Sequence, residues 1–340
     1  MEALKKGVLL VFLLIVVMPL YSVDAESSEV VVAVTHPALK SLATAIGGNR
    51  VRVIMLIPQG VDVHHYEPPA LELLALLREV DIVVMTGPSH LPIEMKIEEL
   101  HRSKLYNWIL VHYPDYVSEG FKLLINPATG KENPHEYVLS MSGLRIIARS
   151  LYRALISVDP EGVEHYELRL ASFLENLERI EKAVESSVKL SSVAKVGLLT
   201  PLLQYAVVDT GLTVSYIVIA EHDIPLEIRD IVKAASDYGK LYDVLVISDE
   251  ELVKHQQVVE ELVRRGVRVV VVPLSTLVRE APELVPLAIA LSLSTPHISV
   301  ELAGGQDVSL YYLTAISAVL AAVITILYVF KLKSHGRTAR

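Results

Sequence analysis

The sequence predicts an α/β protein made of two β-α-β lobes with parallel sheets, joined by one long rigid helix and followed by a C-terminal transmembrane helix. Three observations predict this architecture. Short apolar runs alternate with amphipathic helical segments in both halves of the chain, which is the order of a parallel sheet covered by helices. Residues 162–189 carry an uninterrupted helical pattern between the halves, and residues 309–330 contain no charged side chain.

The first lobe begins with three expected strands separated by two helices. The strands are expected at 30–34, 52–57 and 81–86, and the helices at 38–46 and 70–78. Gly47 and Gly48 end the first helix, and Gly87 with Pro88 ends the third strand, because both residue types interrupt regular structure. The loop 58–69 follows the carboxyl end of the second strand, which is where open α/β sheets bind their ligands.

A long helix and a second set of strands follow. Residues 141–156 show helical spacing, and the Asp-Pro-Glu of residues 159–161 then starts the helix over 162–189, which at ~1.5 Å per residue is about 40 Å long. Such a length suits a rigid strut between two lobes. Beyond it, strands are expected at 195–199, 213–219, 244–247 and 268–272, with helices at 225–238, 250–265 and 277–293.

Both ends of the chain have the pattern of membrane-directed segments. Lys5 and Lys6 precede an apolar run over 8–20 and small residues at 23–25, which is the order of a secretory signal; a buried first helix is the alternative. At ~1.5 Å per residue the segment 309–330 reaches about 33 Å, close to the thickness of a bilayer core. Basic residues follow it, which predicts a cytoplasmic tail and a body on the extracellular side of the cell membrane.

These expectations divide the chain into seven parts. They are a signal peptide (1–25), an N-terminal α/β lobe (26–158), a connecting helix (159–189), a C-terminal α/β lobe (190–293), a stalk (294–308), a single transmembrane helix (309–330) and a cytoplasmic tail (331–340). The transmembrane helix is therefore expected to tether the folded body to the membrane.

Composition restricts the class of protein further. The 340 residues are 52% apolar and 21% charged, which excludes a disordered protein. The sequence has no cysteine, so packing alone must hold the body together and no lipid anchor on an N-terminal cysteine is expected. A net charge of −9 argues against a nucleic-acid partner and favours a cationic ligand. Asparagine and glutamine occur five times each, and their scarcity suggests a heat-adapted source.

Two histidine-bearing segments are the strongest candidates for a functional site. Residues 60–69 place His64 and His65 in a turn after the second strand, and residues 133–137 (Asn-Pro-His-Glu-Tyr) place His135 before a helix. Neutral imidazole is a preferred ligand of zinc and also suits manganese and iron, and such a site needs three or four converging donors. The pattern predicts that His64 and His135 meet at a metal ion; a polar turn without a metal is the alternative.

The body is similar to the zinc and manganese solute-binding proteins of ABC transporters (cluster A-I), over about residues 30 to 290. The family's Gly-x-x-x-His-x-Tyr-Glu-Pro element is matched by residues 60–68, and its Asp-Pro-His-x-Trp element by residues 133–137, with Asn for Asp and Tyr for Trp. The resemblance implies two lobes joined by a long helix and a bound Zn²⁺ or Mn²⁺. It also implies His64 and His135 as metal ligands, and an ABC permease with its ATPase as partners.

The second lobe departs from the family pattern. Where the family has a His or Glu after one strand and an Asp after the last strand, this chain has Thr200-Pro201 and, at 273–275, Pro-Leu-Ser. The sequence offers three substitute ligands at or near strand ends: His36, His222 and Asp249. For each of them a helix cap or a solvated loop is the alternative role.

Three functions fit these observations. The first is a non-enzymatic, membrane-tethered receptor outside the cell that captures zinc, or next manganese, for uptake by an ABC transporter. The second is a solute-binding-like module with a degenerate metal site that serves adhesion or assembly, because strong second-lobe ligands are missing. The third is a zinc hydrolase, which is disfavoured because the sequence has neither a His-Glu-x-x-His nor a Gly-x-Ser-x-Gly motif.

Overall fold

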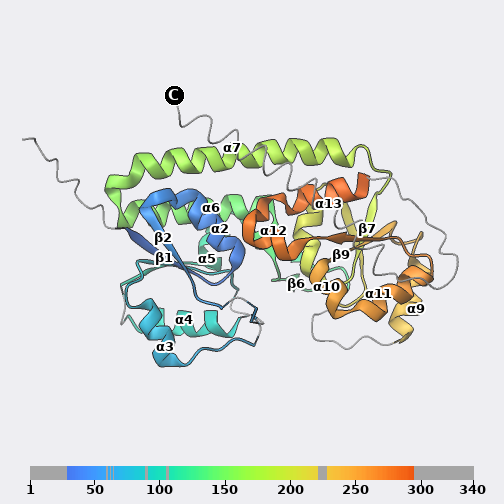
Figure 1. Cartoon of the computed structure of the whole chain (residues 1–340), viewed down its shortest axis with the longest axis horizontal. Coiled ribbons are helices and arrows are strands. Elements are labelled where there is room, and N and C mark those ends of the chain that lie inside the picture. The colour runs from blue at the N-terminus through green and yellow to red at the C-terminus, as the bar shows by residue number, and fades with distance from the viewer. Residues whose placement is uncertain are drawn as a thin grey trace, which may run out of the picture.

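Two lobes lie side by side in the computed structural model, and one long helix runs along both of them (Figure 1). The structure describes residues 29–294, apart from 59, 62, 64, 89–90, 105–106 and 221–227. The predicted signal peptide, the stalk beyond Ser294, the transmembrane helix and the tail lie outside these residues. Within the described part of the chain, no helix is both long and apolar enough to span a membrane.

The first lobe is built on a four-stranded parallel sheet in the order β2-β1-β3-β4. Its strands are β1 (Val30–Val34), β2 (Val51–Met55), β3 (Ile82–Val84) and β4 (Ile109–Val111). All five residues of the central strand β1 are buried, as expected for a parallel strand with helices on both faces. The order reverses between β1 and β3, so the switch point that commonly binds ligands lies at the carboxyl ends of these two strands.

Alternate residues of β1 face two different layers of helices. The helices are α2 (Pro37–Gly47), α3 (Ala70–Leu77), α4 (Pro92–Arg102) and α6 (Met141–Val158). Val32 and Val34 share a core with α2 and α6, whereas Val31 and Ala33 share a core with α3 and α4. This division follows from the two-residue repeat of a strand. The strands and helices expected between residues 30 and 86 are confirmed, with ends that differ by at most two residues.

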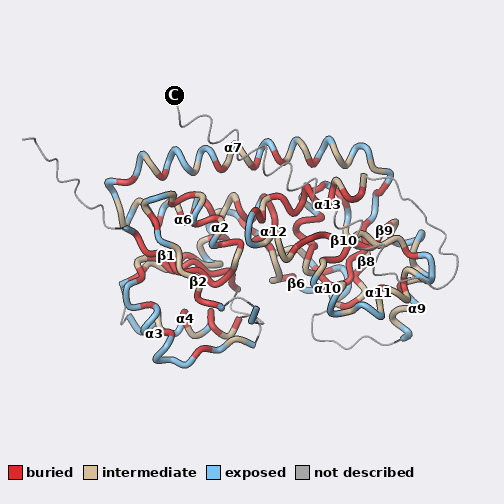
Figure 2. The backbone as a smooth tube through the Cα atoms, viewed as in Figure 1, coloured by how far each residue is buried: buried red, intermediate tan, exposed pale blue. Residues whose placement is uncertain are grey.

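The second lobe repeats this design with a parallel sheet in the order β10-β9-β7-β8. Its strands are β7 (Lys195–Leu198), β8 (Thr213–Ile217), β9 (Val244–Ser248) and β10 (Val269–Val272), and helices α9 (Ile228–Asp237) and α11 (Gln256–Arg264) cover one face. Leu245 and Ile247 belong to a core with these helices. Val244 and Val246 belong instead to the core that contains Val32. One buried core therefore extends across both lobes (Figure 2).

Helix α7 (Val163–Val188) confirms the long helix predicted over 162–189 and has 26 residues. Its buried side chains recur at intervals of three, four or seven residues, which places them on one face. They are Tyr166, Phe173, Leu177, Ile180 and Val184. The guanidinium of Arg50 donates hydrogen bonds of 2.8 and 2.9 Å to Asp159, just before the helix. These bonds lower the pKa of Asp159 and fix the start of α7 to the first lobe.

Two segments of the second lobe that were each predicted as one helix are divided in the structure, so these two predictions are wrong. The helix expected over 250–265 is split at His255 into α10 (Asp249–Lys254) and α11. The helix expected over 277–293 is divided into α12 (Leu274–Glu280), a 3₁₀ turn at Pro282–Leu284 and α13 (Val285–Ser294). Pro282 has no backbone N–H and disfavours a helical conformation at Ala281, the residue before it. Helix α12 therefore ends at Glu280.

Several short elements were not predicted from the sequence. They include α5 (Tyr113–Ser118), the antiparallel strands β5 (Leu124–Ile125) and β6 (Glu132–Asn133), the 3₁₀ turn η2 (Tyr137–Leu139) and helix α8 (Gln204–Val208). Each has too few residues to show a periodic pattern. They matter for function because β6 and η2 flank the segment that carries His135.

Candidate metal site

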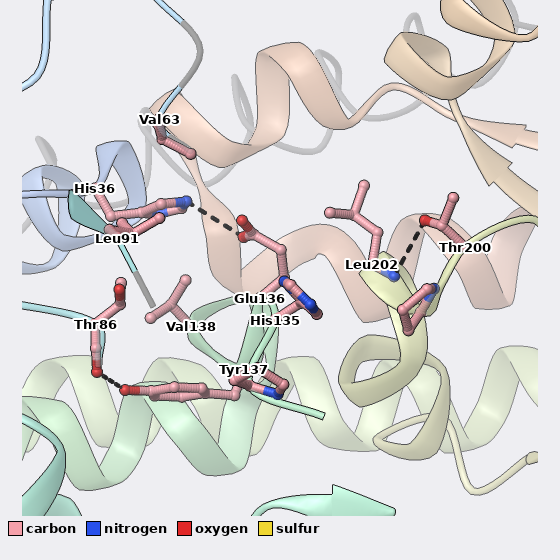
Figure 3. A pocket seen from close by; sticks show the side chains of 12 residues that line it. His36, Val63, Thr86, Leu91, His135, Glu136, Tyr137, Val138, Thr200 and Leu202 are labelled. Atoms are coloured by element: carbon pink, nitrogen blue, oxygen red, sulfur yellow. Dashed lines mark hydrogen bonds and ion pairs between the residues drawn. The ribbon is translucent and has the colours of Figure 1, made fainter. Parts of the chain in front are cut away.

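A pocket that is open to solvent lies between the two lobes (Figure 3). The space in it, including the solvent at its mouth, is about 510 Å³. The first lobe lines it with His36, Thr86 and the loop 134–138, and the second lobe lines it with residues 200–202. His36, Thr86 and Thr200 follow strands β1, β3 and β7 within two residues. The pocket therefore occupies the carboxyl ends of both parallel sheets, which is where open α/β sheets bind ligands.

His135 lines this pocket from the loop between β6 and η2. Its backbone N–H donates a 2.9 Å hydrogen bond to the side-chain oxygen of Asn133, which is buried. On the other side of the loop, buried Tyr137 donates its hydroxyl hydrogen to the carbonyl oxygen of Thr86. Two buried anchors therefore hold the half-buried His135 in the wall of the pocket.

His64, the other predicted first-lobe ligand, lies outside the described residues. Its neighbour Val63 is described and lines the pocket (Figure 3). His222, the substitute predicted in the second lobe, also lies outside the described residues. Among the residues that are described, no three His, Asp or Glu side chains form a group that could hold a metal ion.

His36 reaches the same pocket, but both of its ring nitrogens have partners. Its Nδ1 accepts a 3.2 Å hydrogen bond from the backbone N–H of Ala38 and so caps helix α2. Its Nε2 lies 3.3 Å from a carboxylate oxygen of Glu136 (Figure 3). Burial is the largest single effect and opposes the charged imidazolium, but the carboxylates of Glu136, Glu94 and Glu250 together outweigh it, so the pKa of His36 is raised. An Nδ1 that accepts a hydrogen bond leaves the ring proton on Nε2, where it faces Glu136.

Glu136 was not predicted to belong to the site. Its backbone has the left-handed conformation, with φ of 55° and ψ of 26°, which is uncommon for a residue other than glycine. This conformation directs the carboxylate toward His36 across the pocket (Figure 3). Helical or strand periodicity gives no signal for a single left-handed residue, so the sequence could not place this side chain.

The second-lobe wall of the pocket is formed by Thr200, Pro201 and Leu202. The hydroxyl of Thr200 accepts a 3.4 Å hydrogen bond from the backbone N–H of Leu202 and donates one of 2.5 Å to Glu251. Among the described residues that line the pocket, none from the second lobe carries a carboxylate or an imidazole. The departure from the family pattern at Thr200-Pro201 therefore falls in the wall of the pocket.

Asp249, the remaining predicted substitute, is the first residue of α10 and is not among the residues that line the pocket. Its carboxylate accepts hydrogen bonds from the backbone N–H, at 3.0 Å, and the hydroxyl of Ser275. The next residue, Glu250, interacts electrostatically with both Glu136 and His36. Burial, then the neighbouring carboxylates, raise the pKa of Glu250.

Comparison with known proteins identifies the family. A family model described as "ZnuA: Zinc-uptake complex component A periplasmic" matches residues 32–285. The chain belongs to this family. The match includes the pocket and both lobes, and it confirms the similarity to zinc and manganese solute-binding proteins of ABC transporters that the two histidine elements indicated.

One curated relative in this family is the iron ABC transporter substrate-binding lipoprotein MtsA of Streptococcus pyogenes serotype M1. It is 26% identical over 191 residues, which are 55% of this chain and 60% of MtsA. The matched segment of this chain thus spans less than two thirds of that relative.

Solved structures share the fold of the chain. A crystal structure of ZnuA superposes with a TM-score of 0.63 at 20% identity, covering 78% of this chain and 98% of ZnuA. The solute-binding protein FpvC of Pseudomonas aeruginosa, in complex with Mn²⁺, gives a TM-score of 0.61 at 20% identity and covers 78% of this chain and 97% of FpvC. Two parallel four-stranded sheets and a long helix are therefore the fold of this chain.

Proposed function

We propose that the chain is an extracytoplasmic solute-binding protein that captures a divalent transition metal, zinc in first place and manganese next, for uptake by an ABC transporter. The observation that carries the proposal is the family match over residues 32–285, together with the placement of His135 in the wall of a pocket between two lobes. The metal is the transported solute, and the protein is not an enzyme. Its proposed partners are an ABC permease and the ATPase of that permease.

The proposed first-lobe ligands are His64 and His135. His36 and Asp249 could join them only by giving up the contacts described above, to Glu136 and to Ser275. His222 is the further second-lobe candidate. Neutral imidazole binds metal and imidazolium does not, so protonation of His64 and His135 weakens binding as the pH falls to about 5 to 6.

The proposal includes attachment to the cell membrane by a single span. The segment 309–330 has no charged residue and is proposed as the anchor, with the body on the extracellular side after export by the signal segment 1–25. MtsA is named a lipoprotein. The 340 residues of this chain include no cysteine, so the proposed tether is the apolar helix.

Equilibrium dialysis of the full-length chain, purified in detergent, tests the proposal with Zn²⁺, Mn²⁺ and Fe²⁺. We expect one ion per chain, and its loss in both His64→Ala and His135→Ala. His65→Ala is the matched control, because it removes an exposed imidazole next to His64 and should leave binding unchanged. Equal binding by the wild-type chain and His135→Ala would contradict the proposed site.

A second function is favoured by one observation. The second-lobe wall offers Thr200, Pro201 and Leu202, none of which is a strong metal ligand. A solute-binding-like module with a degenerate metal site, serving adhesion or assembly, would have such a wall. This function predicts that the wild-type chain binds none of the three ions in the same dialysis experiment.

A further inference from the structure

Asn133 stands between the loop of His135 and the second lobe. It is the last residue of β6, a short strand that lies between the two lobes (Figure 1). Only 1% of its surface is exposed. A buried amide must satisfy its hydrogen-bonding groups inside the protein, so the partners of Asn133 reveal what it holds together.

The two ends of the Asn133 amide bind different lobes. Its oxygen accepts a 2.9 Å hydrogen bond from the backbone N–H of His135. Its nitrogen donates bonds of 3.0 Å to the carbonyl oxygen of Pro201 and 2.9 Å to the side-chain oxygen of Gln204. The N–H of His135 can only donate and the carbonyl of Pro201 can only accept, so these backbone groups fix which way the amide points.

The network continues on both sides of Asn133. The nitrogen of Gln204 donates a 2.8 Å bond to the carbonyl oxygen of Ile125 in β5. The hydroxyl of Tyr205 donates a 2.5 Å bond to the carbonyl oxygen of Asn133 and accepts one of 2.9 Å from the N–H of Leu124. Helix α8 of the second lobe is thereby clamped to the β5–β6 hairpin of the first lobe.

We propose that Asn133 is a positioning residue that ties His135 to the second lobe, so that movement of the second lobe is transmitted to this proposed metal ligand. The metal-binding part rests on the proposed function, whereas the tie itself does not. Aspartate, which the family element has at this place, could still accept from the N–H of His135. It would set a carboxylate oxygen against the acceptors of Pro201 and Gln204, so only the amide makes both attachments.

The tie between the lobes can be measured without any metal. The chain has no cysteine, so Leu71→Cys in α3 and Val253→Cys in α10, which are 82% and 81% exposed, give two unique sites for nitroxide labels. Double electron–electron resonance on the full-length, metal-free chain should show a broader distance distribution in Asn133→Asp than in the labelled parent. An unchanged distribution in folded Asn133→Asp would overturn the proposal.

Gln204→Met tests transmission to His135 and serves also if Asn133→Asp fails to fold. The side chain of Gln204 hydrogen-bonds to Asn133 and Ile125 rather than to His135. Its loss removes one of the two bonds that hold the Asn133 amide on the second lobe. Hydrogen exchange of the His135 amide in the metal-free chain should become about fivefold faster, as expected for a loss of about 1 kcal/mol. An exchange rate equal to that of the wild type would contradict the coupling.

Asn126→Asp is the matched control. Asn126 is also buried, and its amide also joins the lobes, through a 2.9 Å bond to the carbonyl oxygen of Ala220. Its side-chain oxygen accepts from the N–H of Ala128 rather than from that of His135. Asn126→Asp should leave the hydrogen-exchange rate of the His135 amide unchanged. An acceleration equal to that in Gln204→Met would overturn the specific role of Asn133.

Zinc affinity provides the final test. Asn133→Asp keeps an acceptor for the N–H of His135 but loses the bonds to the second lobe. We therefore expect zinc to bind about fivefold more weakly, as for a loss of about 1 kcal/mol, with little change for Asn126→Asp. If the wild-type chain binds no zinc, the proposed function fails, while the two metal-free experiments still decide whether Asn133 ties His135 to the second lobe. Equal zinc affinity of Asn133→Asp and the wild type would contradict the part of the inference that concerns the metal.

Discussion

At the scale of single residues, the two described histidines of the pocket differ in how the fold holds them. His36 is 7% exposed, and its nitrogens face the N–H of Ala38 and the carboxylate of Glu136. His135 is half-buried in the wall of the pocket, and Asn133 accepts a hydrogen bond from its backbone N–H. His36 therefore begins helix α2 and pairs with Glu136, whereas His135 is the residue proposed above as a metal ligand.

This difference predicts the effect of replacing His36. His36→Asn should leave zinc affinity within about threefold of the wild type, because asparagine also caps helices well and the pairing with Glu136 is not a metal bond. The matched variant His135→Asn should lose binding. Isothermal titration calorimetry with Zn²⁺ on both variants measures this. If His36→Asn binds as weakly as His135→Asn, then His36 is itself a ligand.

At the scale of elements, helix α6 begins against a carboxylate from the other lobe. Asp209, just after α8, accepts hydrogen bonds from the backbone N–H of Met141 and, at 3.4 Å, from the hydroxyl of Ser142. These bonds favour the ionised form, and so does the positive end of the helix. Burial acts in the opposite direction and is the larger effect, so the pKa of Asp209 is raised to about 6.

A raised pKa makes the stability of the fold depend on pH at this contact. The folded chain binds a proton at Asp209 up to about pH 6, whereas the unfolded chain releases it near pH 4. The contribution of Asp209 to the free energy of unfolding is therefore complete below about pH 4 and is lost as the pH rises through about 6. Asparagine at position 209 cannot ionise and should lack this dependence.

Urea unfolding of the wild type and Asp209→Asn at pH 4, 5, 6 and 7 measures the effect. The free energy of unfolding of Asp209→Asn minus that of the wild type should rise by about 2 kcal/mol from pH 4 to pH 7. The change with pH is the readout, because any fixed loss from the new amide beside Met141 is the same at every pH. A difference between the two proteins that does not vary with pH would show that folding does not raise the pKa of Asp209.

The elements also show what the sequence could and could not predict. Buried strands such as Val30–Val34 were predictable because they are continuous apolar runs. The long helix α7 was predictable because its apolar residues recur at helical spacing over several turns. The break at Pro282 was missed because apolar residues continue on both sides of it.

Within the pocket, the motif singled out His135, whose role as a metal ligand stays a prediction, but no motif singled out Glu136. The location of the Glu136 carboxylate depends on the left-handed backbone of Glu136 itself. The role of Asn133 depends on its contacts with Pro201 and Gln204, which lie 68 and 71 positions further along the chain. Such contacts come from tertiary structure, so no local pattern records them.

At the scale of the whole molecule, the two lobes share one core. Val32 of the first sheet and Val246 of the second belong to the same buried cluster, together with side chains of α7 such as Leu177. Each sheet also has a private core on its other face, which includes Val83 in the first lobe and Leu245 in the second. Separating the lobes would expose the shared core to water, at a cost that grows with the apolar area exposed.

The shared core predicts that both lobes unfold in one cooperative transition. Trp108 is the one tryptophan of the chain and lies buried in the private core of the first lobe, so its fluorescence reports on that lobe alone. Leu245→Ala removes a fully buried side chain from the private core of the second lobe and should lower the free energy of unfolding by about 2 to 5 kcal/mol.

In urea, the Trp108 transition of Leu245→Ala should shift to lower concentration by the same amount as the transition followed by far-ultraviolet circular dichroism. The two transitions should coincide because each sheet covers one side of the shared core. Unfolding of either sheet therefore exposes the part of the core that belongs to the other sheet. Val83→Ala, in the private core of the first lobe, is the matched control and should shift both signals in the same way. A Trp108 transition that stays in place in Leu245→Ala while the dichroism becomes biphasic would show instead that the lobes fold independently, with α7 acting only as a connection.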